Sequence, residues 1–471
     1  MSEALDAIVV GAGSSGLAAV REIGKRTERF LLVNDGPYGT TCARVGCMPS
    51  KVLIEAANAF HEREIFDTMG IRGAAGLSVD LPAVLARVRA LRDDFVAGTL
   101  KLTDRLGERS IAGRATILGP GRVEVAGREY RARSIVLATG SSPVVPKPWR
   151  AFGDRILTTD TLFEQQTLPA RIAVVGLGAI GVEIAQALSR LGLQVWGFDA
   201  AERLAVVADP KVEAVLREAL AGEFQVRTGV AVELAETADG IEVKAGDERI
   251  VVDIVLAAVG RRPNLGGLGL ETLGVELDER GMPPVDPSTM RIGELPVFLA
   301  GDANGDRALL HEAADEGHIA GINAVADEPQ CFQRRTPLGV VFCAPNLATV
   351  GLRFDRFDEA TMIVGEADFR RQSRARMTGR DRGLARVYAD RQSGRLLGAT
   401  MCVPEGEHMA HLLALAVGQR LTVADLLRMP IYHPVVEEGL RGAFRDLARQ
   451  LPDFGKSDLA ACEGLQAEAL D

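Results

Sequence analysis

Two stretches of the chain repeat the same order of apolar strand, glycine-rich turn, amphipathic helix and second apolar strand. The first occupies residues 7–33, with its turn at 11–16, and the second occupies residues 172–198, with its turn at 176–181. Each turn reads Gly-x-Gly-x-x-Gly, in which the glycines permit a tight turn and bring phosphate groups to the helix N-terminus. The repeated pattern therefore predicts two dinucleotide-binding units.

The ends of the second strands indicate which nucleotides bind. The side chain at this position usually binds the ribose hydroxyls. The residue is Asn34, followed by Asp35, in the first unit, and Asp199 in the second. An acidic group suits the free 2′-hydroxyl of NAD, so the second unit predicts NAD rather than NADP. A hydride must pass between the two dinucleotides, which fits one flavin nucleotide and one nicotinamide nucleotide. The candidate cofactor residues in the two turns are Gly11, Gly13, Gly16, Gly176, Gly178 and Gly181.

Three further apolar strands end in small residues, which lets the backbone approach a cofactor. Their ends are Thr139-Gly140, Gly260 and Gly301-Asp302. Asp302 can bind a ribityl or ribose hydroxyl, and the alternative is a helix N-cap. From about residue 338 the pattern changes to mixed strands and helices, which is typical of an α+β domain. The pattern divides the chain at about residues 148, 265 and 337.

Composition narrows the class of protein. The chain has 471 residues, 47% hydrophobic and 25% charged, with a formal net charge of −10. This charge provides no basic footprint for nucleic acid or an anionic membrane. No run of about 18 apolar residues is present to span a membrane, and the first strand begins too early for a signal peptide. We therefore expect a cytoplasmic protein without a bound metal, whose six cysteines do not form a secreted disulfide scaffold.

Cys42 and Cys47 stand five positions apart, just before an apolar helical run. Five residues of regular helix rise about 7.5 Å, more than the roughly 4.4–6.8 Å between the Cα atoms of a disulfide. Cys42 must therefore lie in an irregular turn if the pair is bridged, and Gly46 and Pro49 suit such a boundary. A redox couple, two buried free cysteines and half a metal site all fit this spacing. The flanking nucleotide units favour the redox couple.

A histidine near the C-terminal end is the candidate general base. His433 is followed by Pro434 and, five positions on, by Glu438. Histidine titrates near neutral pH, and a carboxylate can fix its tautomer and raise its basicity. A surface or packing role is the ordinary alternative for such a residue. We favour the role of general base for His433, because a dithiol elsewhere in the protein has to be deprotonated.

Taken together, these motifs resemble the pyridine nucleotide–disulfide oxidoreductases, most closely dihydrolipoamide dehydrogenases, over nearly the whole chain. The resemblance implies an α/β, glutathione reductase-like fold with two Rossmann-like domains and a C-terminal α+β dimerisation domain. By the resemblance, the domains are a FAD-binding domain (1–148), an NAD-binding domain (149–265), a central domain completing the FAD site (266–337) and a C-terminal interface domain (338–471). It also implies a homodimer that oxidises free dihydrolipoamide or a lipoyl-bearing carrier protein. By resemblance, Cys42 exchanges with substrate, Cys47 faces the flavin, and the other subunit's His433 is the acid/base, oriented by Glu438. Lys51 and Glu183 resemble the family's ion pair beside the flavin, and Gly301-Asp302 its second FAD motif.

Several positions depart from the family pattern. Thr40 stands where a glycine is usual, Arg44 where an asparagine is common, and Val435 where a threonine usually follows His-Pro. Asn34 replaces the ribose acid, while Cys343 and Asn346 vary another familiar stretch. Arg44 could meet an acidic carrier, lower a thiol pKa or remain a solvated surface charge. The alternative functions are an NAD(P)H-dependent reductase of another small disulfide, similar to glutathione reductase, and a non-catalytic redox-sensing flavoprotein.

Overall fold

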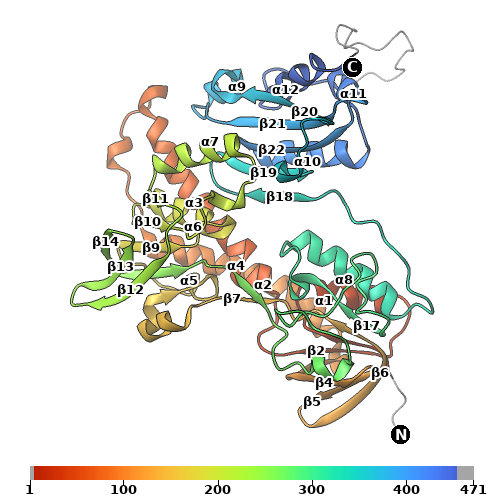
Figure 1. The fold of residues 1–471 in the computed structure, drawn as a ribbon. Coiled ribbons are helices and arrows are strands. Elements are labelled where there is room, and N and C mark those ends of the chain that lie inside the picture. Colours follow the sequence, from red (N-terminus) through yellow and green to blue (C-terminus); the bar gives the residue numbers. More distant parts are fainter. Residues whose placement is uncertain (1–4, 453–471) are drawn as a thin grey trace.

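A seven-stranded sheet organises the N-terminal part of the chain in the computed structural model, which describes residues 5–452 (Figure 1). Its central strand β1 (Leu5–Val10) pairs in parallel with β2 (Phe30–Asn34) and β6 (Arg128–Leu137). Both faces are buried, which explains the continuous apolar runs. Helices α1 (Ser14–Ile23) and α8 (Leu310–Ala324) pack together on one face. The other elements of this part are β3 (Ser110–Ala112), β4 (Ala115–Gly119), β5 (Arg122–Val125), β17 (Val297–Leu299), α2 (Thr41–Val45), α3 (Cys47–His61) and α4 (Leu81–Asp104).

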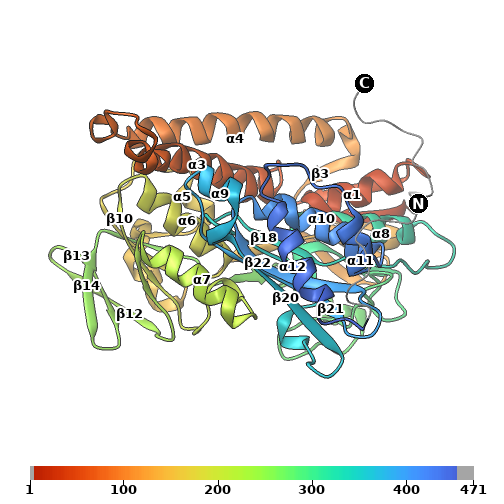
Figure 2. The ribbon, with the colours of Figure 1, turned by 90° about the horizontal axis from the view of Figure 1, so that it is seen from above.

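The second glycine turn belongs to a separate five-stranded parallel sheet. In it β9 (Arg171–Val175) lies between β10 (Gln194–Phe198) and β15 (Ile254–Ala257). The predicted order of strand, turn, helix and strand is confirmed in both copies. Helix α6 (Ala179–Arg190) also packs against α3, which lies beside the long α4 (Figure 2). The remaining elements are α5 (Thr159–Leu162), α7 (Pro210–Ala221), β8 (Ile156–Leu157), β11 (Gln225–Arg227), the β12–β14 sheet (Val232–Thr237, Gly240–Ala245, Glu248–Val252) and the β7–β16 pair (Ser141–Pro143, Arg261–Pro263).

The C-terminal part is an antiparallel five-stranded sheet with helices packed on one face. The opposite face contributes Leu347 and Cys402 to the same apolar cluster as α6 and α7. The sheet therefore lies between its own helices and the second nucleotide unit. Its elements are β18 (Leu338–Val341), β19 (Asn346–Gly351), β20 (Met362–Asp368), β21 (Leu384–Asp390), β22 (Leu396–Val403), α9 (Ser373–Met377), α10 (Gly406–Gly418), α11 (Val423–Arg428) and α12 (Glu438–Ala448).

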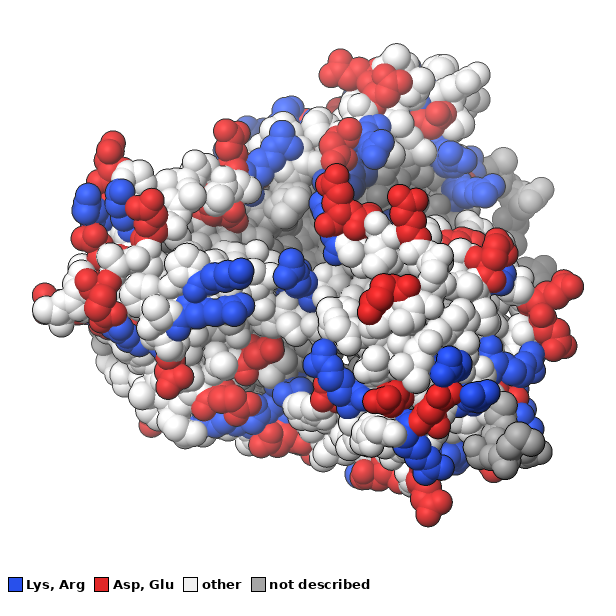
Figure 3. Space-filling view, turned by 60° about the horizontal axis from the view of Figure 1, so that its bottom comes forward, with Lys and Arg blue, Asp and Glu red and all other residues white. Residues whose placement is uncertain are grey.

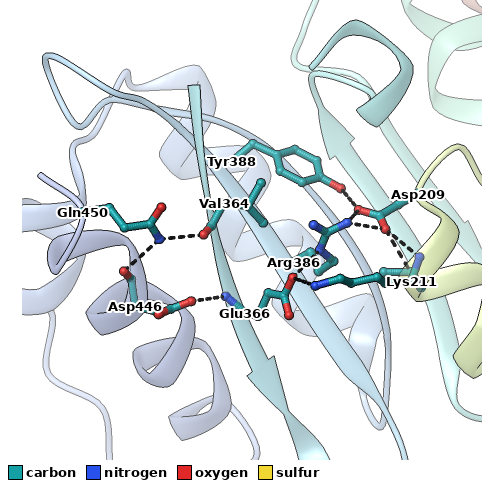
Figure 4. A network of polar contacts seen from close by, with 9 residues as sticks. Asp209, Lys211, Val364, Glu366, Arg386, Tyr388, Asp446 and Gln450 are labelled. Atoms are coloured by element: carbon teal, nitrogen blue, oxygen red, sulfur yellow. Dashed lines mark hydrogen bonds and ion pairs between the residues drawn. The ribbon is translucent and has the colours of Figure 1, made fainter. Parts of the chain in front are cut away.

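A buried polar network joins this sheet to the second nucleotide unit (Figure 4). Asp209 is fully buried and caps α7, where it accepts hydrogen bonds from backbone N–H groups. The guanidinium of Arg386 lies 2.6 Å from each oxygen of Asp209, and the Tyr388 hydroxyl donates to the same carboxylate at 2.7 Å. Lys211 reaches Glu366 at the exposed end of the network. One carboxylate thus links a helix cap to two residues of β21.

Substituting Arg386→Met is expected to destabilise the protein by about 3–5 kcal/mol, because it leaves Asp209 buried without its cation. Lys211→Met removes an exposed ion pair of the same network and is expected to cost less than about 1 kcal/mol. Chemical denaturation of the cofactor-loaded protein measures both changes. Equal losses in the two variants would contradict this account of the buried pair.

Candidate functional site

The two glycine turns are built alike. Gly11 and Gly176 have φ angles of +108° and +94°, which favour glycine. A Cβ at either would lie within 2.3 Å of a carbonyl oxygen from the neighbouring strand end. At Gly16 and Gly181 a Cβ would lie 1.8 Å from the carbonyl oxygen of the first glycine of the same turn. Backbone packing therefore requires glycine at both ends of each turn.

The residues at the strand ends hold these turns in place. The Asn34 side-chain oxygen accepts a hydrogen bond from the Ala12 N–H at 2.9 Å, and Asp199 accepts one from the Leu177 N–H at 2.6 Å. Asn34 and Asp199 thus occupy equivalent positions, as the repeated pattern predicts. Asp35 is exposed and makes no comparable contact with the turn. The roles of these three residues toward ribose stay predictions.

The first turn has features that fit a bound dinucleotide. The hydroxyls of Ser15 and Thr139 are buried, yet neither has a hydrogen-bond partner among the described residues. Buried hydroxyls are normally paired, so both are available to a ligand that the protein encloses. Open space also lies beside the glycines that face the two nucleotide positions. The glycines at which a Cβ would meet no atom within 4 Å include Gly13, Gly140, Gly178 and Gly260.

The Gly301-Asp302 pair begins a short helical turn after β17. The Gly301 N–H donates to Glu316 at 2.7 Å, and burial raises the pKa of that carboxyl. Asp302 accepts a hydrogen bond from the Ser141 hydroxyl at 2.7 Å. Ser141, Asp302 and Arg261 line a cavity of about 1140 Å³. Asp302 thus combines a fixed orientation with access to a cavity, which suits the predicted contact with a sugar hydroxyl.

Cys42 and Cys47 lie on either side of a break between two helices. Cys42 belongs to α2, Cys47 is the first residue of α3, and Gly46 between them has φ −118° and ψ −115°, which is not helical. The irregular turn expected from the spacing is therefore present. Thr40 caps α2 by accepting a hydrogen bond from the Ala43 N–H, and its φ of 60° explains why a glycine is usual there.

The two thiols differ in acidity. Both cysteines are free, so this is the reduced form of the pair. A hydrogen bond between the sulfur atoms raises the pKa of Cys42 far above its usual range and lowers the pKa of Cys47 to about 7. Burial opposes the second shift, and the Lys51 ammonium assists it. Lys51 is thus a cation that acts on both thiols of the pair. Cys47 is therefore the sulfur prepared to carry negative charge.

Lys51 is held by a contact that joins three parts of the fold. Its ammonium lies 2.7 Å from a Glu183 oxygen and 4.5 Å from the centre of the Phe342 ring. The other Glu183 oxygen accepts the Phe342 N–H at 2.8 Å. The predicted Lys51–Glu183 pair is thus present. Its third member, Phe342, was not expected from the sequence.

Two more residues of α6 continue this polar face. Gln186 exchanges hydrogen bonds with the backbone of Ala344, each at 2.8 Å. Arg190 binds Glu223 and also donates to Asn58 on α3 at 2.6 Å. Sequence reasoning missed both residues. The available signal was the occurrence of polar side chains at intervals of three and four in an otherwise apolar helix.

His433 and Glu438 form the expected pair. The His433 Nδ1 lies 3.0 Å from a Glu438 oxygen, and the other oxygen accepts the Val435 N–H at 3.3 Å. The hydrogen bond from His433 lowers the pKa of Glu438. The histidine side chain is 72% exposed, and no hydrogen bond or ion pair between described residues joins it to Cys42 or Cys47 of the same protomer. This placement leaves its second nitrogen open to a molecule outside the protomer.

The described part of the chain contains neither a metal-binding cluster nor a membrane-spanning helix. Within residues 5–452, no three His, Cys, Asp or Glu side chains gather into a group that could hold a metal ion. The helices of the same range include none that is both long and apolar enough to cross a membrane.

Comparison with known proteins identifies the family. Residues 5–317 match the pyridine nucleotide-disulphide oxidoreductases, and residues 338–444 match the dimerisation domain of these enzymes. The chain belongs to this family. It is a flavin-dependent disulfide oxidoreductase that uses FAD and NAD(H), and its dimerisation domain supports a homodimer. The predicted family, α/β fold class and cofactors are thus confirmed, whereas the exact domain boundaries stay predictions.

Relatives of known name resemble the chain over nearly its whole length. It is 33% identical to the dihydrolipoyl dehydrogenase of Thermus scotoductus over 460 residues, 94% of this chain and 98% of the relative. It is 30% identical to dihydrolipoyl dehydrogenase 3 of Pseudomonas aeruginosa, over 95% and 98% of the two chains. LpdA from Mycobacterium tuberculosis has a similar structure, with a TM-score of 0.83 at 26% identity, covering 94% and 99%. The disulfide reductase RclA of Escherichia coli shares the fold, with a TM-score of 0.83 at 21% identity over 94% and 99%.

The Cys47 thiol is expected to ionise with a pKa near 7 in the reduced protein when Cys42 is replaced by serine, because the hydroxyl can still donate to the sulfur. Cys42→Ala removes the donor and is expected to raise that pKa. The pH dependence of iodoacetamide labelling at Cys47, followed by peptide mass spectrometry, gives both values, with the exposed Cys331 as reagent control. Identical profiles for the two variants would refute the hydrogen-bond assignment.

Proposed function

We propose that this oxidoreductase oxidises a dihydrolipoyl group, borne by a carrier protein or free as dihydrolipoamide, and reduces NAD⁺ to NADH. The observation that carries this proposal is the unequal pair Cys42 and Cys47, in which one sulfur is stabilised as thiolate and the other is not. The names of relatives about 30% identical to the chain support the choice of substrate.

The proposed role of His433 follows from its surroundings. Glu438 holds Nδ1, so Nε2 takes a proton from the dithiol substrate. Because His433 is exposed on its own protomer, we assign it to the disulfide of the other subunit in the homodimer. The substrate thiolate that results is the nucleophile.

This thiolate attacks the Cys42 sulfur of the oxidised pair, forming a mixed disulfide, and the Cys42–Cys47 bond breaks. Cys47 leaves as thiolate, which the nearby Lys51 stabilises. The second substrate thiol then displaces Cys42, and its proton passes to the leaving Cys42 sulfur, whose pKa is raised. The substrate leaves as a disulfide, and the enzyme pair holds two electrons as the Cys42 thiol and the Cys47 thiolate. A flavin held beside Cys47 would supply the two-electron chemistry that connects the reduced pair to NAD⁺.

The residues proposed to hold FAD are those of the first glycine turn with Asn34, Asp35, Lys51, Thr139, Gly140 and the Gly301-Asp302 pair. Ser15 joins this set because its buried hydroxyl lacks a partner among the described residues. Glu183, the ion-pair partner of Lys51, belongs with the same FAD set. For NAD we assign the second glycine turn with Asp199 and Gly260. The Asp199 carboxylate faces the Leu177 N–H within that turn, which sets its orientation toward a ribose.

Replacing His433 by glutamine is expected to lower kcat for dihydrolipoamide oxidation by a factor of about 10²–10⁴, the usual contribution of a general base. NADH formation by the FAD-loaded dimer measures this rate, and the flavin absorbance checks that FAD is retained. His408→Gln, another exposed histidine beside carboxylates, is the matched control.

The outcomes separate the candidate functions. Unchanged turnover in the His433→Gln variant would remove the base assignment. Failure of the wild-type enzyme to oxidise dihydrolipoamide, with rapid reduction of glutathione disulfide by NADPH, would replace the proposed substrate. Absence of turnover in every assay would favour a redox sensor.

A further inference from the structure

One short segment of the C-terminal domain is strongly basic although the whole chain carries a net charge of −10. Residues 370–382, here called the arginine segment, contain one acidic residue, Asp381, and six arginines. In the single protomer all six side chains are exposed. They are Arg370, Arg371, Arg374, Arg376, Arg380 and Arg382.

Few of these charges are neutralised locally. Arg370 binds Asp368, and Arg380 lies between Glu62 and Glu405. The other four arginines make no ion pair with the described residues. The face drawn in Figure 3 carries both acidic and basic side chains. The arginine segment therefore presents a local positive field that the protein itself does not cancel.

This segment is attached to the loop of the proposed base. The buried Gln372 caps α9 and donates from its amide nitrogen to the Val435 carbonyl, two residues beyond His433, at 2.7 Å. The ring of Phe369 packs against the backbone of Gly439, where a Cβ would lie 2.3 Å from it. Gly439 is the second residue of α12, which begins at Glu438. The arginine segment thus lies beside the loop that carries His433, the proposed general base.

We propose that the arginine segment is the docking surface for an acidic protein domain that carries the dihydrolipoyl group. The proposal rests on the proposed function and adds the chemical character of the partner. Complementary charge raises the rate of encounter and orients the partner. Free dihydrolipoamide is uncharged, so its reaction does not use this surface.

Reversing Arg371, Arg374 and Arg376 to glutamate tests the surface. In the FAD-loaded dimer, this variant is expected to raise KM for a dihydrolipoyl domain of net negative charge by about tenfold or more, because steering is lost. Its KM for free dihydrolipoamide and its kcat are expected to stay unchanged. For the wild type, added salt is expected to raise only the KM for the domain.

The matched control reverses three exposed arginines outside the segment, Arg21, Arg26 and Arg105, with the same change of net charge. An equal rise in KM for both triple variants would show a general charge effect and overturn the proposal. Dissociation of the segment variant into monomers, with an intact control dimer, would also overturn it, since the segment would then hold subunits together. RNA binding by the wild type and by the segment variant can be measured by calorimetry. If the wild type binds RNA, the segment variant does not, and the KM for the domain is unchanged, the result would overturn the proposal in favour of nucleic acid.

A direct binding measurement separates the proposed docking surface from the proposed substrate. Calorimetry with the same acidic domain compares its affinity for wild type and for the segment variant. Equal affinities would overturn the docking surface even if dihydrolipoamide is oxidised. Failure of the wild type to oxidise free dihydrolipoamide would instead overturn the proposed function, and affinity lost in the variant would still support the docking surface.

Discussion

The ion pair between Lys51 and Glu183 is the contact on which the redox centre depends. Lys51 lies one helical turn after Cys47, while Glu183 belongs to α6 and also binds the Phe342 N–H. The Glu183 side chain is 7% exposed, so its charge is tolerable only because both oxygens are satisfied. The same contact fixes the ammonium beside the thiolate. Position and electrostatics of the site thus come from one buried carboxylate shared by three parts of the fold.

Local pattern predicted much of this molecule. The repeated strand, turn and helix order indicated both nucleotide units. A bridge between Cys42 and Cys47 would need an irregular turn between them, and the helix break found at Gly46 provides it. Contacts between distant segments were beyond such reasoning. Periodicity identifies the buried face of a helix but not its partner, so the links from Gln186 and Arg190 to other domains were missed.

Departures from the family pattern were also difficult to interpret from sequence. Asn34 and Asp199 differ in charge, yet each side-chain oxygen accepts the same backbone N–H of its glycine turn. An amide and a carboxylate are equivalent for that contact, so residue type alone could not separate a structural role from nucleotide recognition. Thr40 likewise keeps a backbone conformation usual for glycine while its hydroxyl caps α2. In both cases a hydrogen bond to the backbone explains the substitution.

The network around Asp209 bears on how such proteins can be recombined. Its carboxylate lies in the second nucleotide unit, whereas Arg386 and Tyr388 lie in the C-terminal sheet. A chimaera that exchanged only one of these parts with a relative would bury a charge without its counterpart unless the donor carried the same pair. The segments that contain Asp209 and Arg386 must therefore be exchanged together, although 177 positions separate these residues.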